Sequence, residues 1–417
     1  MARPALAGRR KLTAGELDLI LGAHARFVRG EPGGKRCSLP FVDFAGLDLA
    51  GRELSGAELS GSVFDGAKLT GAKLAGANLS GCDLRGADLR GAMLARADLR
   101  GACLQGANLA HADLTEVDLR PGKVAMPHPS RGFPAVVEEA RNGELDHATI
   151  TGATLDRSRL QGLFAVSADF SDCSMSGAIL MDANLKDANL SGAHLENAEV
   201  SGADLRGADL KGAIVTGVKL SGANTHGAQM EGALEAPSRA TLTRAGQIGA
   251  ALKGHDQWVR SGGKQGARAV VDGEDLRPLG DTLKGLRLTA LSAKRACLVG
   301  LDLTDVQLQG ADLEAADLRG AILRDADLRG ARLTGADLTK AQLQGALLAP
   351  LPLGAGRSTP TVLTGARLRS AVATGADLSG ATLGDADMKG CDLTGAKLAA
   401  VELSPAQRRS VRGLETE

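Results

Sequence analysis

The chain has 417 residues, of which 2% are aromatic and none is tyrosine, so the sequence excludes an ordinary core built around large aromatic side chains. Basic and acidic residues number 49 each, and this zero net charge excludes simple bulk attraction to nucleic acid or to a membrane surface. No apolar run is long enough to span a bilayer.

Residues 1–36 are basic and predict an N-terminal helical cap followed by a turn-rich loop. Thr13 precedes a glutamate by three residues, which is the spacing of a capping box. A helix that begins there brings four side chains to one face: Leu17, Leu21, His24 and Val28. Because Asp18 and His24 interrupt the apolar part, we expect no signal peptide here and a cytoplasmic protein.

Residues 37–119 repeat with a period of five. Every fifth residue from Leu39 to Leu119 is leucine or phenylalanine, with a small residue two places before it and usually a glycine two places after. A five-residue step turns an α-helix by about 140° and sends successive strand side chains to opposite faces, so neither element buries them together. A short extended piece and a corner in each unit places all of them inside, with glycine at the corner.

These units resemble the A(D/N)LXX motif of the pentapeptide repeat family, as in ADLRG at 87–91 and 203–207 and ADLT at 336–339. The resemblance extends over most of the chain. It implies an all-β fold, a right-handed quadrilateral (four-sided) parallel β-helix solenoid with four repeats per coil. With four repeats per coil, Phe44 is expected to stack on Phe64, and Leu89 to lie inside the core while Arg90 faces water.

Residues 120–142 break the period, and four prolines indicate a loop excursion, within which Pro134 could start one short helix that ends at Arg141. The second repeat block, residues 143–231, resumes the pattern. At Leu163 and Ala165 the large and small inward positions are exchanged, which conserves the core volume.

Residues 232–285 leave the period again and form a second helical cap and linker module. Six of its residues match the first module at an offset of 231: Ile248, Leu252, His255, Trp258, Val259 and Arg260 correspond to Leu17, Leu21, His24, Phe27, Val28 and Arg29. A Gly-Gly-Lys loop follows each copy, at Lys35 and Lys264. We expect both helices to cap solenoid ends and the second to separate two lobes, 1–233 and 240–417. The alternative is that the histidine and arginine of each module bind a ligand.

The third repeat block spans residues 286–404 and contains a loop at 350–361, which we expect to replace about one repeat because Leu353 keeps the five-residue register. Residues 405–417 predict a C-terminal helix and tail, with Ser404 as its cap and Pro405 at its first position. In some members of the resembled family such a helix forms a dimer, so a homodimer is possible here.

The sequence contains no pattern typical of a catalytic, cofactor-binding or metal-binding site, so we expect no enzyme and no cofactor. The six cysteines have no CxxC spacing; Cys37, Cys82, Cys173 and Cys391 are expected to be buried, and Cys103 and Cys297 to face outward. The loops GEPGGKR and SGGKQG lack the first glycine of a phosphate loop, since Arg29 and Trp258 stand at that position.

Two functions remain open. The first is a non-enzymatic scaffold or protein-binding module, with the loops at 120–142 and 350–361 as contact points and a protein partner of unknown identity. The second, implied by the resemblance, is mimicry of DNA by an acidic rod that protects a DNA-binding enzyme such as gyrase. Residues 37–119 carry a net charge of −4 and residues 143–231 of −6, which permits this alternative; direct nucleic-acid or membrane binding is not expected.

Overall fold

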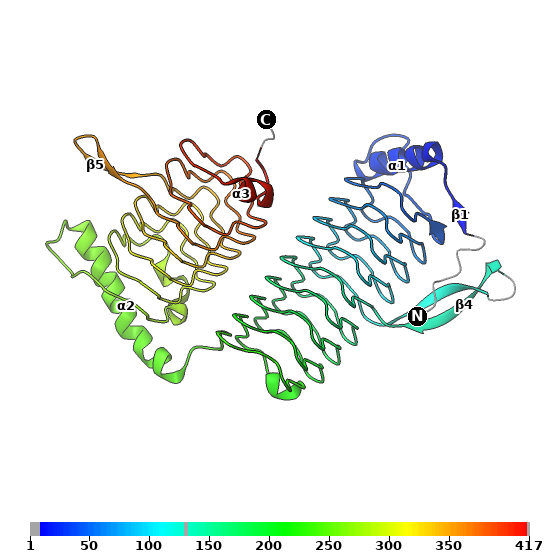
Figure 1. Ribbon diagram of the computed structural model, residues 1–417, viewed down its shortest axis with the longest axis horizontal. Helices are drawn as coiled ribbons and strands as arrows, with labels where there is room; N and C mark the ends of the chain where they lie inside the picture. Colours follow the sequence, from blue (N-terminus) through cyan, green and yellow to red (C-terminus); the bar gives the residue numbers. More distant parts are fainter. Residues whose placement is uncertain (1–8, 129–131, 415–417) are drawn as a thin grey trace. The chain divides into compact units, whose positions relative to one another are not determined.

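The computed structural model describes residues 9–128 and 132–414 and divides the chain into two compact units, Met1–Ala236 and Pro237–Glu417 (Figure 1). The division lies inside the linker expected between the two lobes. The elements of the first unit are β1 (Arg10–Lys11), α1 (Ala14–Val28), β2 (Val42–Asp43), β3 (Gly122–His128), β4 (Gly132–Arg141) and the 3-10 helix η1 (Leu220–Gly222). Those of the second are α2 (Arg239–Arg260), the 3-10 turns of η2 (Arg277–Leu283), β5 (Leu351–Gly354), β6 (Arg357–Thr359) and α3 (Pro405–Ser410).

Each unit is a stack of coils joined by isolated parallel bridges. The bridges recur every five residues and join residues twenty positions apart, as in Asp48 with Lys68 and Lys68 with Asp88. Four repeats therefore complete one coil, and four ladders of bridges run along each stack. The longest strands, β3 to β6, are not part of these ladders but form two hairpins.

Each repeat is closed by a tight turn. The Ala72 N–H donates to the Leu69 carbonyl at 3.0 Å, and Gly71 between them has a φ of 63°. A turn of this type needs a positive φ at its third residue, which explains why glycine usually stands two places after the central leucine. Other residues adopt the same φ at some turns, as Arg96 does at 58°. The Leu69 N–H donates to the carbonyl of Asp88 in the next coil at 2.7 Å, so each turn also joins two coils.

The predicted division into inward and outward side chains is confirmed. Leu89 is fully buried, whereas the neighbouring Arg90 is exposed. The rings of Phe44 and Phe64 stack with centroids 4.7 Å apart and planes 7° from parallel. Leu163 and Ala165, where the large and small inward positions are exchanged, are also both fully buried. Position within the five-residue repeat thus sets which side chains form the core.

The helix α1 begins at the predicted capping box. The Glu16 N–H donates to Thr13 Oγ1 at 3.2 Å, and the Thr13 N–H donates to the Glu16 carboxylate at 2.9 Å. Of the four residues predicted to share one face, Leu17, Leu21 and His24 are buried, and Val28 at the end of the helix is 42% exposed. The loop after α1 folds back so that the Lys35 N–H donates to the Ala23 carbonyl, and the chain enters the first coil beside that earlier turn.

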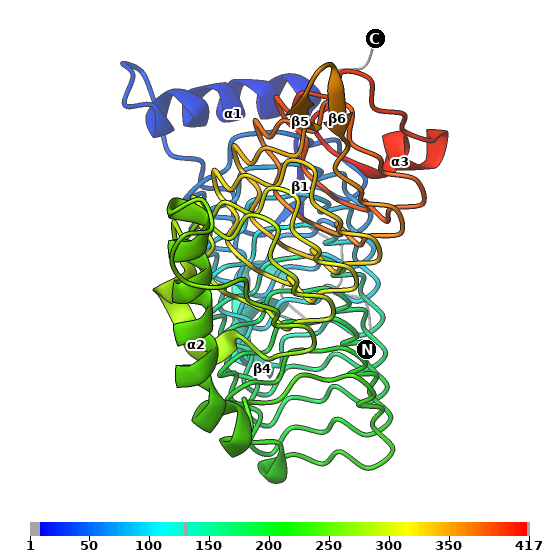
Figure 2. The same ribbon diagram turned by 90° about the vertical axis from the view of Figure 1, so that its left-hand side faces the viewer.

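The segment before α1 adds a strand that the sequence did not indicate. In β1, Arg10 and Lys11 pair in parallel with Val42 and Asp43 of β2. This pairing extends one ladder by a single step beyond the first coil. Figure 2 shows α1 lying across the same end of the first unit.

The predicted short helix from Pro134 to Arg141 is wrong, because these residues lie in β4, which pairs antiparallel with β3. An isolated short helix is marginal in water, whereas the hairpin gives the backbone hydrogen-bonding partners. The ladder closes over this insertion: Cys103 pairs with Glu144, 41 residues later instead of twenty.

The loop in the third block is the hairpin of β5 and β6. Arg332 pairs with Val362, thirty residues on, so the hairpin lengthens one coil by ten residues. The expected replacement of one repeat is wrong, and Leu353 is 55% exposed instead of holding its place in the core. The leucine register survived in the sequence because ten residues equal two repeats.

The ladder of the second unit begins at Val270, which pairs with Ser292, and not at Leu286 as expected. The residues before Leu286 depart from the A-x-L pattern, yet Val271 and Leu276 are buried in the core. At the other end, the predicted start of α3 is confirmed: the Gln407 N–H donates to Ser404 Oγ. Gln407 Nε2 also donates to the carbonyls of Gly384 and Ala386, which fixes α3 on its own solenoid.

Candidate functional site

Among residues 9–128 and 132–414, no three metal-ligating side chains gather at one place. No helix of that part of the chain is long and apolar enough to cross a membrane. The prediction of buried thiols is confirmed for Cys37, Cys82, Cys173 and Cys391. Cys103, expected to face outward, lies outside the core cluster but is buried, because Glu144 of the next coil lies over it with Oε2 3.1 Å from Sγ.

Burial raises the pKa of five of the six thiols. It raises the pKa of Cys37 and Cys297 to about 11, and that of Cys82, Cys103 and Cys391 to about 12. A thiol with such a pKa is protonated at neutral pH, and the thiolate is the form that acts as nucleophile or metal ligand. These cysteines therefore pack in or beside the core and offer no nucleophile.

The two histidines of the duplicated module hold backbone. His24 Nδ1 accepts the Cys37 N–H at 3.0 Å, and His255 Nδ1 accepts the Ala269 N–H at 2.9 Å. Both imidazoles are fully buried, and His255 Nε2 lies 3.0 Å from the Thr289 carbonyl, to which it donates. Each histidine therefore fixes the point at which the chain enters the first coil of its unit.

The arginines of the module form local ion pairs. Arg29 contacts Glu31 at 2.5 Å, and Arg260 contacts Asp256 at 2.6 Å, one turn earlier on α2. Asp256 in turn accepts the Arg287 N–H at 2.8 Å. The histidine and the arginine of each module are both engaged by the protein itself. This favours a capping role for the module over ligand binding.

Many outward-facing arginines of the first two repeat blocks form ion pairs with the aspartate two residues before them. In each Asp-Leu-Arg unit the arginine folds back on the aspartate, as in Arg90 Nη2 at 2.6 Å from Asp88, which lowers the pKa of that carboxyl. The same pairing recurs at Asp83–Arg85, Asp98–Arg100, Asp118–Arg120 and Asp204–Arg206. These pairs leave the first block with a net charge of −4.

Both hairpins are anchored by a proline that packs on a corner glycine of a neighbouring coil. A Cβ added at Gly162 would lie 3.3 Å from Pro121 Cγ, and one added at Gly380 would lie 3.0 Å from Pro350 Cγ. Beyond this anchor, β5 and β6 are exposed along most of their length. Figure 1 shows both hairpins projecting sideways from the coils of their own units.

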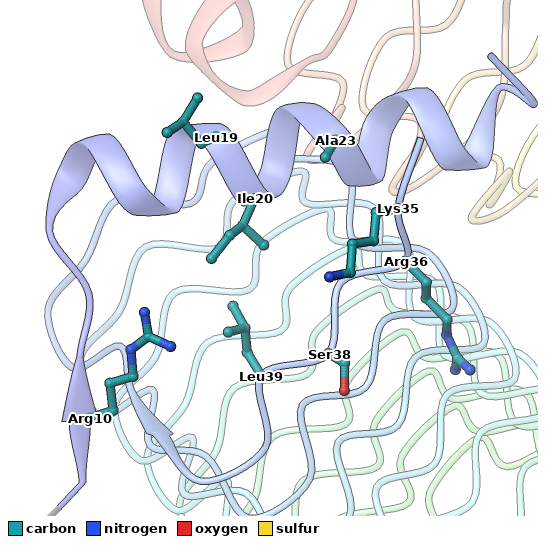
Figure 3. Close-up of a pocket in the computed structure, with 8 residues that line it drawn as sticks. All are labelled: Arg10, Leu19, Ile20, Ala23, Lys35, Arg36, Ser38 and Leu39. Atoms are coloured by element: carbon teal, nitrogen blue, oxygen red, sulfur yellow. The ribbon is translucent and has the colours of Figure 1, made fainter. Parts of the chain in front are cut away.

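A cavity of about 400 Å³ lies between α1 and the first coil (Figure 3). Ile20 of α1 points toward Leu39 of the coil, and the charged ends of Arg10 and Lys35 approach from two sides. Arg36 points away and donates to the Gly56 carbonyl at 2.6 Å. We refer to this cavity as the α1 groove. Sequence reasoning missed it, because its walls come from three segments with no shared motif.

The chain resembles known proteins along its repeats. The model of the family described as Pentapeptide repeats matches residues 43–120, 150–234, 287–348 and 361–398. No curated protein matches. Among solved structures, the pentapeptide repeat protein Rfr23 from the cyanobacterium Cyanothece 51142 is 30% identical over 33% of this chain and 90% of its own, with a TM-score of 0.26.

Two other similar structures are HetL and QnrB1. HetL from the cyanobacterium Nostoc sp. strain PCC 7120, involved in heterocyst differentiation regulation, is 21% identical over 91% of this chain and 96% of its own, with a TM-score of 0.18. Full-length QnrB1, a plasmid-mediated fluoroquinolone resistance protein, is 20% identical over 45% and 93%, with a TM-score of 0.19. Because the family model matches more than half of the chain, the chain belongs to the pentapeptide repeat family.

Proposed function

We propose that this protein is a non-catalytic, cytoplasmic protein-binding solenoid of the right-handed, four-sided type, whose two hairpins contact a protein partner. The observation that carries the proposal is the pair of hairpins. Neither β3–β4 nor β5–β6 joins the ladders of the solenoid, and core packing does not explain why the coils accommodate them. Segments that project from a rigid scaffold are where proteins commonly place their binding surfaces.

Their manner of attachment supports a specific role. Each hairpin leaves the coil at a proline seated on a glycine, and the five-residue ladder continues on both sides of it. The hairpins are therefore held in a defined position by a stiff support. A preorganised projecting strand pair loses little freedom on binding, which favours affinity.

The proposal is tested by deleting each hairpin and recovering partners from the native cell. Removal of residues 350–359 shortens the thirty-residue coil from Arg332 to Val362 to the ordinary twenty residues, because ten residues equal two repeats. We expect the melting temperature to change little and a partner bound by the full chain to be lost. A partner retained by both hairpin deletions would contradict the role of the hairpins.

The alternative of DNA mimicry is favoured most by the second block, with 12 acidic and 6 basic residues. Asp146 and Asp156 of that block accept backbone N–H groups and are not in Asp-Leu-Arg units. If mimicry is the function, the purified protein should alter gyrase supercoiling at low salt, and the effect should weaken as salt rises. Because both blocks contain self-paired Asp-Leu-Arg units and the whole chain has zero net charge, mimicry is the second candidate.

A further inference from the structure

We propose that the α1 groove binds an extended acidic peptide, which adds one strand to the free backbone edge at Ser38. The proposal rests on the proposed function as a protein-binding module, but it uses a surface that the hairpins do not form. It follows from three observations: an open ladder position, a groove with apolar and cationic walls, and a second cap that lacks these walls.

The edge at Ser38 is open on the side of α1. On its other side the ladder is complete: the Glu58 N–H donates to the Cys37 carbonyl, and the Leu39 N–H donates to the Glu58 carbonyl. Within residues 9–128 and 132–414, neither the N–H nor the carbonyl of Ser38 has a hydrogen-bonding partner. Such an edge is a template for an added strand.

The neighbouring ladder position shows what this edge accepts. There β1 pairs in parallel with Val42 and Asp43, one step beyond the first coil. This end of the solenoid therefore already accommodates one added strand at the next corner. A peptide at Ser38 would repeat that arrangement, with main-chain hydrogen bonds for affinity and alternate side chains for specificity.

The walls of the groove indicate the chemistry of the peptide. Ile20 and Leu39 offer apolar contact on two sides, and Leu19 at the rim is 77% exposed. Lys35 has no ion pair in the described part of the chain, and its ammonium points into the groove. Arg10, paired with Glu16 at 3.1 Å, adds a second cation. Apolar side chains flanked by carboxylates complement these walls.

The second cap shows that capping does not require these residues. The Ala267 N–H donates to Gly254 as the Lys35 N–H donates to Ala23, so Ala267 is the structural equivalent of Lys35. Lys264, which follows the Gly-Gly pair of the second loop as Lys35 follows that of the first, lies three residues before Ala267 and is not the structural equivalent of Lys35. At an offset of 231, Ala250 and Ala251 replace Leu19 and Ile20. The cavity beside α2 is lined instead by Lys253, Pro278 and Leu279, so the two caps differ in the residues that form their walls.

Fluorescence anisotropy with the full chain tests the proposal. The probe is a fluorescein-labelled hexapeptide that alternates valine with aspartate or glutamate, and the matched control replaces each acid with lysine. We expect saturable binding of the acidic probe, weakened at least tenfold between about 50 and 300 mM salt because the cations are solvent-accessible. Equal binding of the two peptides would overturn the proposal.

Two changes separate the walls from the edge. The triple variant Leu19→Ala, Ile20→Ala, Lys35→Ala gives the first cap the residue types of the second and is expected to fold and to lose at least tenfold in affinity. Ser38→Pro removes the free N–H without breaking a hydrogen bond of the solenoid. An N-methylated acidic probe tests the edge with an unaltered protein, and its undiminished binding would exclude strand addition.

Failure of this inference is distinguishable from failure of the proposed function. Deletion of residues 350–359 should leave binding of the acidic probe unchanged. A cellular partner that depends on the hairpins, combined with no binding of the acidic probe, would leave the proposed function standing and overturn the groove. Probe binding that survives the triple variant and Ser38→Pro would place the peptide elsewhere and would also overturn it.

Discussion

The two capping modules perform the same structural task with different surfaces. In both, a buried histidine accepts the N–H of the residue that opens the first coil, and a leucine one turn before it lies in the core. Other residues of the two helices diverge: α1 has the exposed Leu19 and the partly buried Ile20 where α2 has Ala250 and Ala251. The inner face of the cap is therefore set by the solenoid it closes, and the outer face is free to acquire a separate role.

The largest losses of stability are expected when the buried leucines of the two caps are truncated. Leu252→Ala in α2 and Leu21→Ala in α1 should each destabilise their own unit by about 2–5 kcal/mol, since both side chains are nearly fully buried. Chemical denaturation gives the total loss, and hydrogen exchange shows which unit opens. Leu242→Ala, at a position 56% exposed on α2, is the matched control and should cost little.

A smaller loss should follow removal of either histidine. His24→Ala and His255→Ala leave the N–H groups of Cys37 and Ala269 without their acceptors, which costs about 1–3 kcal/mol for a buried donor. The loss should be confined to the unit that carries the substitution. His226→Ala, at an exposed position, is the control. A loss shared equally by both units would show that the caps are not independent.

Acidification should lower the stability of the first unit through the histidine of its cap. Burial lowers the pKa of His24 from its ordinary value of 6.5. The folded first unit therefore favours the neutral imidazole, whose stabilisation is present above pH 6.5 and is lost as the pH falls below it. Urea midpoints measured between pH 7.5 and 5 should fall for the first unit, and His24→Ala should remove this part of the slope. An unchanged slope in the variant would contradict the assignment.

The smallest effects are expected at the arginines that end the duplicated motif. Arg29 and Glu31 are both exposed, so Arg29→Ala should leave the melting temperature of the first unit unchanged. Arg260→Ala should lower that of the second unit slightly, because its partner Asp256 is nearly buried. A large loss at Arg29 would mean that the ion pair holds the loop which enters the first coil.

Much of the solenoid could be predicted from the sequence, because a five-residue period gives every unit the same neighbours. The burial of Leu89, the exposure of Arg90 and the stacking of Phe44 on Phe64 all follow from position in the repeat. The start of α1 at Thr13 was equally predictable, since a capping box is a contact between residues three apart. The family followed from the same pattern.

Departures from the period were decided by contacts between distant residues. The segment from Pro134 to Arg141 forms a strand because β3 lies beside it, and Cys103 is buried because Glu144, 41 residues later, lies over it. The α1 groove depends on the loop and on β1 meeting the first coil, and the edge at Ser38 is open because no coil formed by residues 9–36 lies on that side. In a repeat, the same residue types occupy the same position in every unit and meet the same neighbours, so the sequence by itself determined the core of this protein. Its ends and insertions lack that repetition, and only the tertiary structure decided their surfaces.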